Sequence, residues 1–260
     1  MINNPKTAIC FVADFRYLYK NFKRINNELR TKGNYKGEIL IITSIFAPTF
    51  LIKDIKKFKN VKILRFKKIK FSKSTEHSLK NLNIKENRHI NKNFQWNKIY
   101  LFNKKIKNWK YIFYFDINMN IHNDINPIIN IRPDKKIFAR ADGFPNYEWK
   151  LSSQFDVSQE IYTKLSEIYN LERTDYFQTG LMYFDTNIVK ESTFDEILSL
   201  VEKYPISTTN EQGILNLYFL FIDQKYEELE TYIDGKLSYF YWRLDDTEAI
   251  ITKSLMKQNK

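Results

Sequence analysis

Short apolar runs alternate with segments of helical periodicity over the first 66 residues, and this order restricts the possible folds most strongly. Residues 7–13, 38–43 and 61–66 are rich in β-branched and aromatic side chains, which predicts buried strands. Helical segments to about Leu29 and over 49–58 separate them. Strand–helix–strand order is typical of a mostly parallel sheet with helical crossovers. The sequence therefore predicts an α/β protein.

The rest of the chain continues the same pattern. The predicted elements are a long basic loop with a helical piece over 67–93, a helix over 94–107 with Trp96, Ile99, Phe102 and Ile106 on one face, strands over 111–115 and 136–141, helices over 157–169 and 194–204, a strand-like run over 176–184 and an apolar helical run over 214–222. Gly180 interrupts the 176–184 run, which predicts close backbone approach by another group. No repeat or linker divides the chain, so residues 1–260 are predicted to form a single domain, either a whole protein or one domain of a longer chain.

Composition excludes several classes of protein. Hydrophobic residues make up 43% of the chain, with only 6 Gly and 6 Pro, so a large core is available and a linker-rich protein is excluded. The single cysteine, Cys10, allows no internal disulfide and no cysteine-built zinc site. No run has the length of a signal-peptide core or a membrane span, and no Gly-rich phosphate loop follows the first strand. We expect a cytoplasmic protein, compatible with contact at a membrane face.

The net charge of +12 is concentrated in one segment. Residues 53–110 hold 19 Lys or Arg against three acidic residues. Such a segment attracts phosphates, an anionic acceptor or a membrane face; the alternative is a solvated lysine-rich surface. Arg65 and Arg88 are its only arginines, which argues against nucleic acid as the partner.

A carboxylate and two amides follow the predicted strand 111–115. Asp116 comes directly after the strand, and Asn118 and Asn120 follow at alternate positions. A carboxylate at the end of a buried strand needs a cation or hydrogen-bond donors, and ligands of open α/β sheets bind at this edge. Asp116 and Asn118 are therefore either oxygen ligands of a divalent cation that also binds a phosphorylated ligand, or residues of a turn that Asp116 caps.

Four short stretches together resemble the retaining glycosyltransferases of family 8, the glycogenin and bacterial galactosyltransferase group. They are residues 11–14 (FVAD) with Tyr17, 114–118 (YFDIN), 176–182 (YFQTGLM) and 211–216 (EQGILN). Each stretch is short, but their order and strand contexts agree with the family over about residues 7–216. The resemblance implies a GT-A fold, a Rossmann-like domain with a mostly parallel central sheet flanked by helices.

The resemblance also implies an activity. Members of this family move a sugar from a UDP-sugar donor to a glycan, a lipid-linked sugar or a protein, with retention at the anomeric carbon. Mn²⁺ or Mg²⁺ would be bound by Asp116 and Asn118 and would stabilise the diphosphate leaving group. The expected partners are a UDP-sugar and an acceptor that contains carbohydrate. The basic segment would also suit an acceptor that carries negative charge.

The resemblance assigns roles to individual residues. Ala13, Asp14 and Tyr17 would contact the uridine; Lys98 would pair with phosphate or the donor sugar; Asp142, Gln178 and Glu211 would bind sugar hydroxyls beside Gly180; and Gln212 would lie nearest the anomeric carbon. Gln212, Glu211 and Lys98 are thus the expected catalytic residues, and Gln212 takes an electrostatic and positioning role.

Each assignment has a structural alternative. Gln178 would then be a satisfied buried amide, Glu211 a carboxylate at a helix N-terminus, Tyr17 a core residue and Lys98 one more exposed lysine.

Three departures from the family pattern matter. Asn118 stands where the family has a second metal carboxylate, and Gln178 and Glu211 are each one methylene longer than the family residues. The family's C-terminal stretch with a metal-binding histidine has no counterpart, and His122, near Asp116, is expected on the surface. These departures leave a second possibility, a catalytically weak module that binds a nucleotide-sugar or a glycan on the same fold.

Overall fold

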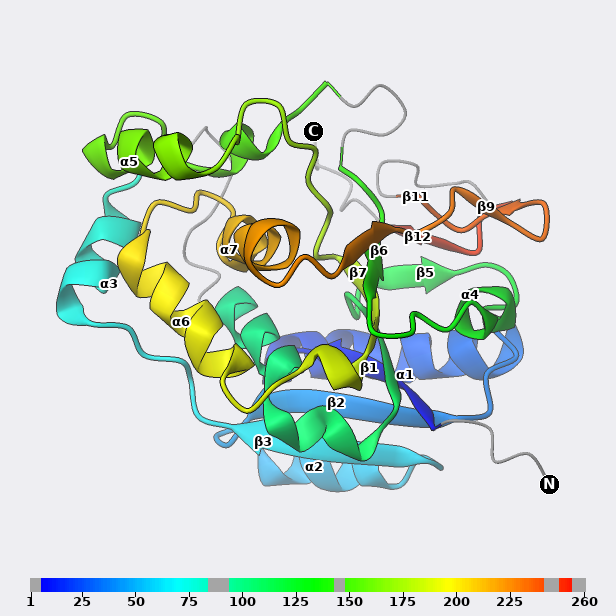
Figure 1. The fold of residues 1–260 in the computed structure, drawn as a ribbon. Helices are drawn as coiled ribbons and strands as arrows, with labels where there is room; N and C mark the ends of the chain where they lie inside the picture. The colour runs from blue at the N-terminus through cyan, green and yellow to red at the C-terminus, as the bar shows by residue number, and fades with distance from the viewer. Residues whose placement is uncertain (1–5, 84–93, 143–147, 241–247, 254–260) are drawn as a thin grey trace, which may run out of the picture.

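The computed structural model describes residues 6–83, 94–142, 148–240 and 248–253. Its centre is a seven-stranded sheet (Figure 1). In spatial order its strands are β3 (Val61–Phe66), β2 (Glu38–Ser44), β1 (Thr7–Val12), β4 (Tyr111–Phe115), β7 (Leu181–Asp185), β6 (Ile137–Ala139) and β8 (Tyr226–Glu228). β3, β2, β1 and β4 are parallel, and β7 is antiparallel to both β4 and β6. The predicted mostly parallel α/β sheet is confirmed.

Alternating side chains of the central strands build one core on each face of the sheet. In β4, Ile112 and Tyr114 point to one core, while Phe113 and Phe115 point to the other. Cys10 of β1 lies in the first core as a small apolar residue. Because both faces are covered, these strands are almost continuously apolar, as parallel strands are when helices flank them.

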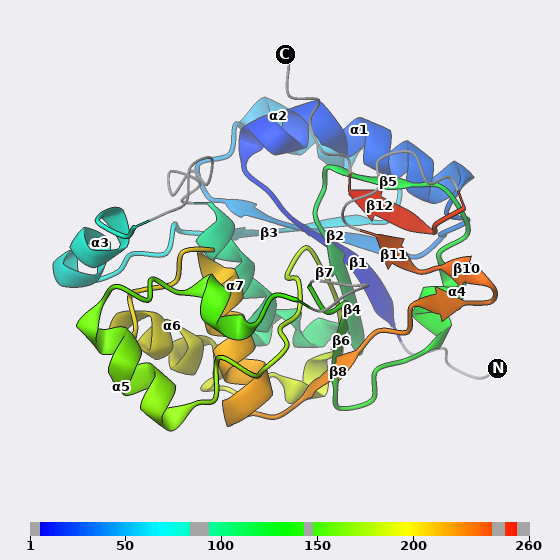
Figure 2. The same cartoon turned by 90° about the horizontal axis from the view of Figure 1, so that it is seen from above.

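Helices form the outer layers (Figures 1 and 2). One face is covered by α1 (Phe15–Thr31), α2 (Thr49–Lys56) and α4 (Asn126–Asn130). The other is covered by α3 (Lys73–Lys80), the 3₁₀ helices η1 (Gln95–Phe102) and η2 (Lys104–Asn108), α5 (Glu160–Ile168), α6 (Thr193–Lys203) and α7 (Glu211–Leu217). Short 3₁₀ helices η3 (Leu151–Gln154) and η4 (Thr186–Ile188) and a π-helical turn η5 (Tyr218–Ile222) complete the set.

Two small sheets, which the sequence did not predict, lie beside the central one. β9 (Tyr232–Ile233) pairs with β10 (Lys236–Leu237). β12 (Ile251–Lys253) lies between β11 (Tyr239–Phe240) and β5 (Met119–Ile121), and its pairing with β5 is antiparallel. This pairing brings the C-terminal segment next to the residues that follow Asp116.

Two predictions of local structure were wrong. The helix expected over 94–107 is two 3₁₀ helices, because Asn103 adopts an extended conformation and its side chain accepts the Lys105 N–H. The strand expected over 176–184 begins only at Leu181, directly after the Gly180 that interrupts the run. The expected basic loop contains α3, and residues 84–93, with Arg88 and His89, lie outside the described residues.

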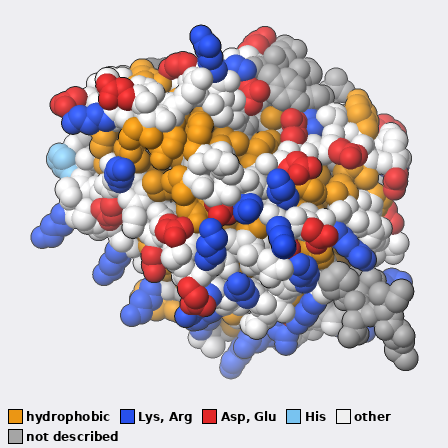
Figure 3. Space-filling view, in the orientation of Figure 1, with side chains coloured by type: hydrophobic (Ala, Val, Ile, Leu, Met, Phe, Trp, Pro, Cys, Tyr) orange, Lys and Arg blue, Asp and Glu red, His pale blue; other side chains and the backbone are white. Residues whose placement is uncertain are grey.

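The lysine-rich surface carries charges of both signs. On the face shown in Figure 3, lysine and arginine side chains are spread among acidic and neutral ones. From the basic segment, Lys57 pairs with Asp54, and Lys104 pairs with Glu191. Lys98 of the same segment is buried instead, which separates it from these surface lysines.

Candidate active site

Asp116 lies at the carboxyl-end edge of the sheet, directly after β4. Its backbone N–H donates to the carbonyl of Gly180 across the β4–β7 pair at 2.9 Å. Its Oδ1 accepts a hydrogen bond from the Tyr114 hydroxyl at 2.6 Å and lies 3.3 Å from Lys98 Nζ. Its Oδ2 accepts from Lys253 Nζ. Burial raises the pKa of Asp116, but Lys253 and Lys98 outweigh burial and hold that pKa well below its ordinary value.

Lys98 joins Asp116 to Glu211. Its ammonium lies 2.9 Å from Glu211 Oε1 and 3.4 Å from the carbonyl of Thr179. The side chain is only 9% exposed, so the alternative of one more surface lysine is excluded. Burial alone would lower the pKa of Lys98, but Asp116 and Glu211 reverse the effect and raise it, which keeps the ammonium charged.

Lys253 is the site residue that the sequence did not reveal. It is the last residue of β12, is 11% exposed and pairs with Asp116 Oδ2. The available signal was the apolar run 249–251 followed by Thr252 and Lys253, a pattern typical of a short buried strand that ends at a polar site. We name Lys98, Asp116, Glu211 and Lys253 the charge cluster; two carboxylates balance two ammonium groups.

Glu211 and Gln212 begin α7 and contact the turn before β7. The Thr179 hydroxyl lies 3.1 Å from Glu211 Oε1, and the Thr179 N–H donates to Gln212 Oε1 at 3.1 Å. The Gln212 amide donates to Gln154 Oε1 at 2.9 Å. Within the described part of the chain, Glu211 Oε2 is buried without a hydrogen-bond partner, an acceptor that a hydroxyl group would satisfy.

Gln178 and Asp142 bind each other. Gln178 Nε2 donates to Asp142 Oδ1 at 2.5 Å, and the Tyr239 hydroxyl lies 3.4 Å from Gln178 Oε1. Both side chains are buried, so Gln178 matches the alternative of a satisfied buried amide. The structure therefore brings these two predicted site residues into contact, and their roles toward a sugar remain predictions.

The predicted uridine-binding residues follow β1 at the same edge. Ala13 is buried, and Asp14 caps α1 by accepting the Tyr17 N–H at 2.9 Å. Tyr17 is 37% exposed, so the alternative of a core residue is excluded. Burial, and then the Asp14 and Asp116 carboxylates, raise the pKa of the Tyr17 hydroxyl.

Gly180 is the residue at which the sequence predicts close backbone approach by another group. A Cβ at this position would lie 3.3 Å from Met119 Cε, 3.4 Å from the Tyr239 hydroxyl and 3.7 Å from Asp116 Oδ2. A Cβ here would press only on the flexible end of Met119 and would meet the other two atoms at ordinary van der Waals distance, so the close approach stays a prediction.

The residues present fit a divalent cation poorly. Both oxygens of Asp116 are already engaged, and Asn118 offers a neutral amide where a second carboxylate would add charge. Two like unit charges about 4 Å apart repel by about 4 kcal/mol at an effective dielectric constant of about 20. A cation on Asp116 would meet such repulsion from both Lys98 and Lys253.

No further ligands compensate within the described residues. There, no group of three or more His, Cys, Asp and Glu side chains is placed to hold a metal ion. His122, expected on the surface, is partly buried and shares a hydrogen bond of 2.8 Å with the Thr252 hydroxyl.

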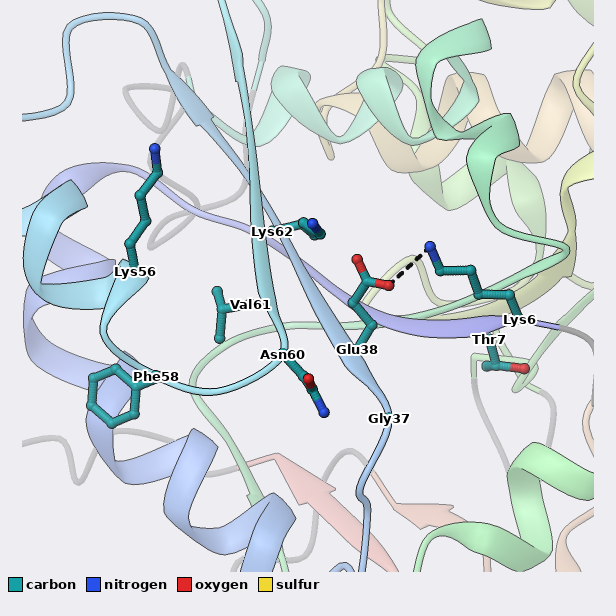
Figure 4. Close-up of a pocket in the computed structure, with 9 residues that line it drawn as sticks. All are labelled: Lys6, Thr7, Gly37, Glu38, Lys56, Phe58, Asn60, Val61 and Lys62. Carbon is teal, nitrogen blue, oxygen red and sulfur yellow. Dashed lines mark ion pairs between the residues drawn. The ribbon is translucent and has the colours of Figure 1, made fainter.

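A separate cavity of about 630 Å³ opens at the opposite, amino-end edge of the sheet (Figure 4). Its lining includes Lys6, Glu38, Lys56 and Lys62, and Lys6 pairs with Glu38 at 3.0 Å. None of the predicted site residues lines it. Because ligands of open α/β sheets bind at the carboxyl ends of the strands, the charge cluster is the candidate active site rather than this cavity.

Comparison with known proteins rests on structure. No protein-family model and no curated protein matches the sequence. The galactosyltransferase LgtC, solved with donor and acceptor sugar analogues, matches 95% of this chain and 86% of its own at 13% identity, with a TM-score of 0.60. The bifunctional glycosyltransferase WbbM matches the whole chain over 47% of its own at 14% identity, with a TM-score of 0.59.

A more distant likeness agrees with these two. The mannosyltransferase Ktr4p of S. cerevisiae matches 87% of this chain and 69% of its own at 14% identity, with a TM-score of 0.54. At sequence identities this low, the structural similarity is evidence for a shared fold and not for a shared activity. The chain thus has the fold of the GT-A glycosyltransferases, as its resemblance to family 8 predicted.

Proposed function

We propose that this protein is a retaining glycosyltransferase that uses a UDP-sugar. The observation that carries the proposal is the buried charge cluster at the carboxyl-end edge of the sheet, beside Gln212. Buried charges are costly unless they are paired, and their concentration at the ligand-binding edge is typical of a functional site. The glycosyltransferase structures that share the fold support the same reaction class.

The reaction exchanges one bond at the anomeric carbon for another. The bond to the β-phosphate oxygen breaks, and its electron pair stays on that oxygen. The acceptor hydroxyl oxygen bonds to the same carbon and loses its proton, so the products are a glycoside, UDP and a proton. Lys98 would stabilise the charge that develops on the leaving diphosphate.

The neighbouring polar groups would bind and orient the sugar. Glu211 Oε2 would accept a hydrogen bond from a sugar hydroxyl, since it is a buried acceptor without a partner in the described residues. Gln212 is oriented by Thr179 and Gln154, so its amide would hold a fixed dipole near the anomeric carbon. No step is assigned to a divalent cation.

The acceptor is proposed to contain carbohydrate. LgtC was solved with an acceptor sugar analogue, and a glycan, a lipid-linked sugar or a glycosylated protein would each present such a hydroxyl. Among the described residues, no helix has the length and apolarity to span a bilayer. The basic segment 53–110 would favour an anionic acceptor or a membrane face.

The second candidate is a module that binds a nucleotide-sugar without turning it over. Asn118 at the expected metal position favours this alternative, because it lowers the ligand charge. The two functions differ in a single measurable product, free UDP.

A UDP-release assay with a panel of UDP-sugars and simple glycoside acceptors tests the proposal. We expect release above background that falls about 10²-fold in Gln212→Ala, the size of effect seen when one oriented electrostatic group is lost. Gln224→Ala, at an exposed glutamine outside the predicted site, serves as the matched control. Binding of UDP-sugars without release in any combination would favour the binding module.

A further inference from the structure

The charge cluster gives the expected metal position an ammonium group. Lys253 Nζ contacts Asp116 Oδ2, the oxygen that Lys98 and Tyr114 do not contact. The sequence substitutes an amide for a carboxylate at the same place, Asn118. Two carboxylates with a divalent cation sum to zero charge, and so do one carboxylate, one amide and one ammonium group. The two changes together therefore leave this position balanced without a cation.

The position of Lys253 is set by strand pairing. In the antiparallel pairing of β12 with β5, Lys253 lies opposite Met119, three residues after Asp116. Thr252 of the same strand lies opposite Asn120, and its hydroxyl shares a hydrogen bond with His122. The register therefore holds the lysine stem beside Asp116, and the ammonium is not a flexible surface group.

We propose that the Lys253 ammonium replaces a divalent cation at the donor diphosphate, so that nucleotide binding does not require metal. The inference rests on the proposed function, since it names which charge meets the diphosphate there. Lys253 and Lys98 would face the phosphate oxygens from two sides, and Asp116 would hold both ammonium groups in place before the nucleotide arrives. Ammonium groups are established phosphate partners that act as point charges.

Calorimetric titration of UDP and of uridine tests this role, each in EDTA and in MnCl₂. For the wild-type protein, we expect UDP affinities in the two buffers to agree within about twofold. Lys253→Ala should weaken UDP binding at least tenfold in EDTA and leave uridine binding unchanged, because only UDP carries the diphosphate. Manganese should restore part of the UDP affinity in Lys253→Ala, since Asp116 is then free to bind a cation.

Two further variants separate charge from folding. Lys253→Arg keeps the positive charge and should retain most of the UDP affinity. Lys236→Ala removes a lysine of the same C-terminal segment, whose ammonium bonds to Asn123 at 2.7 Å, and should bind UDP as the wild-type protein does. The melting temperature of each variant shows whether the fold persists.

The outcomes distinguish this inference from the proposed function. Wild-type UDP binding that is lost in EDTA and restored by manganese would overturn the inference and leave the transferase proposal standing. If the folded Lys253→Ala variant binds UDP in EDTA as tightly as the wild-type protein does, the inference about Lys253 is also overturned and the transferase proposal still stands. If neither UDP nor GDP binds the wild-type protein, with or without manganese, both proposals fail.

Discussion

The carboxyl-end and amino-end edges of the central sheet both carry lysine–carboxylate pairs, but at different depths. Lys98 and Glu211 are 2.9 Å apart with side chains 9% and 3% exposed. Lys6 and Glu38 are 3.0 Å apart with side chains 54% and 15% exposed. The two distances are almost equal, so the length of an ion pair does not tell a functional site from a surface contact. The two pairs differ instead in burial and in the number of charged partners that they share.

The amino-end edge also has one fully buried carboxylate, and it differs from Asp116 in its partners. Asp185 accepts from Lys110 Nζ at 2.7 Å and from the backbone N–H groups of Lys135 and Asn187 at 2.9 Å each. Two backbone N–H groups and one ammonium group thus satisfy Asp185, whereas two ammonium groups and the Tyr114 hydroxyl satisfy the side chain of Asp116. The donors to Asp185 stabilise a turn, whereas the ammonium groups at Asp116 lie at the edge of the sheet where ligands bind.

The largest difference between the edges should follow removal of one carboxylate from each. Asp116→Ala removes the carboxylate that Lys98 and Lys253 share, and breaking a buried pair costs about 3–5 kcal/mol. Glu38→Ala breaks a partly exposed pair and should cost about 0–1 kcal/mol. Urea unfolding of both variants measures the difference. Equal losses of unfolding free energy would show that the two edges are not distinct.

An effect of intermediate size is expected at Asp185, whose contribution to the free energy of unfolding should depend on pH. Burial raises the pKa of Asp185, but Lys110 and the backbone donors outweigh burial and lower it. Because the folded pKa lies below the unfolded one, the stabilisation is complete above the unfolded pKa of about 3.9 and is lost as pH falls through the folded pKa.

Asp185→Asn should therefore lower the free energy of unfolding by about 1–3 kcal/mol at pH 7, and the gap to wild type should narrow below about pH 4. Urea unfolding at several pH values provides the measurement. UDP affinity at pH 7 should stay unchanged, because Asp185 lies at the edge opposite the charge cluster. A gap that is constant with pH would contradict the assigned cause.

The smallest effect is expected in the amino-end cavity. Lys62→Glu reverses an exposed charge in its lining, and such surface changes usually alter stability by no more than about 0.5 kcal/mol. UDP affinity should agree with wild type within about twofold in calorimetric titration. A tenfold loss would move the donor site from the carboxyl-end edge to this cavity.

The sequence predicted the sheet well because its strands are short apolar runs bounded by polar turns. β3 and β4 were predicted at their observed bounds, and β1 and β2 within one residue. The helix over 94–107 failed because the spacing of its apolar residues also suits consecutive 3₁₀ turns, which bury Lys98 together with them.

The site was predicted in part. Asp116, Lys98 and Glu211 were expected together, and the structure places them in contact. Lys253 was missed because its partner is 137 residues away in the sequence, and no local pattern reports a contact of that separation. The pairing of Gln178 with Asp142 was missed for the same reason, since each lies in its own short stretch.

The antiparallel pairing of β12 with β5 also bears on how the chain reaches its native state. The contact between Lys253 and Asp116 joins residues 137 positions apart, so forming it costs the chain conformational entropy. Contacts within the central sheet offset that cost, and we therefore expect β12 to pair with β5 late in folding. The hydrogen bonds within a helix such as α1 join residues close in sequence, so they do not carry this entropy cost. A nucleotide that binds the charge cluster would thus distinguish the fully folded chain from compact intermediates in which β12 is not yet paired.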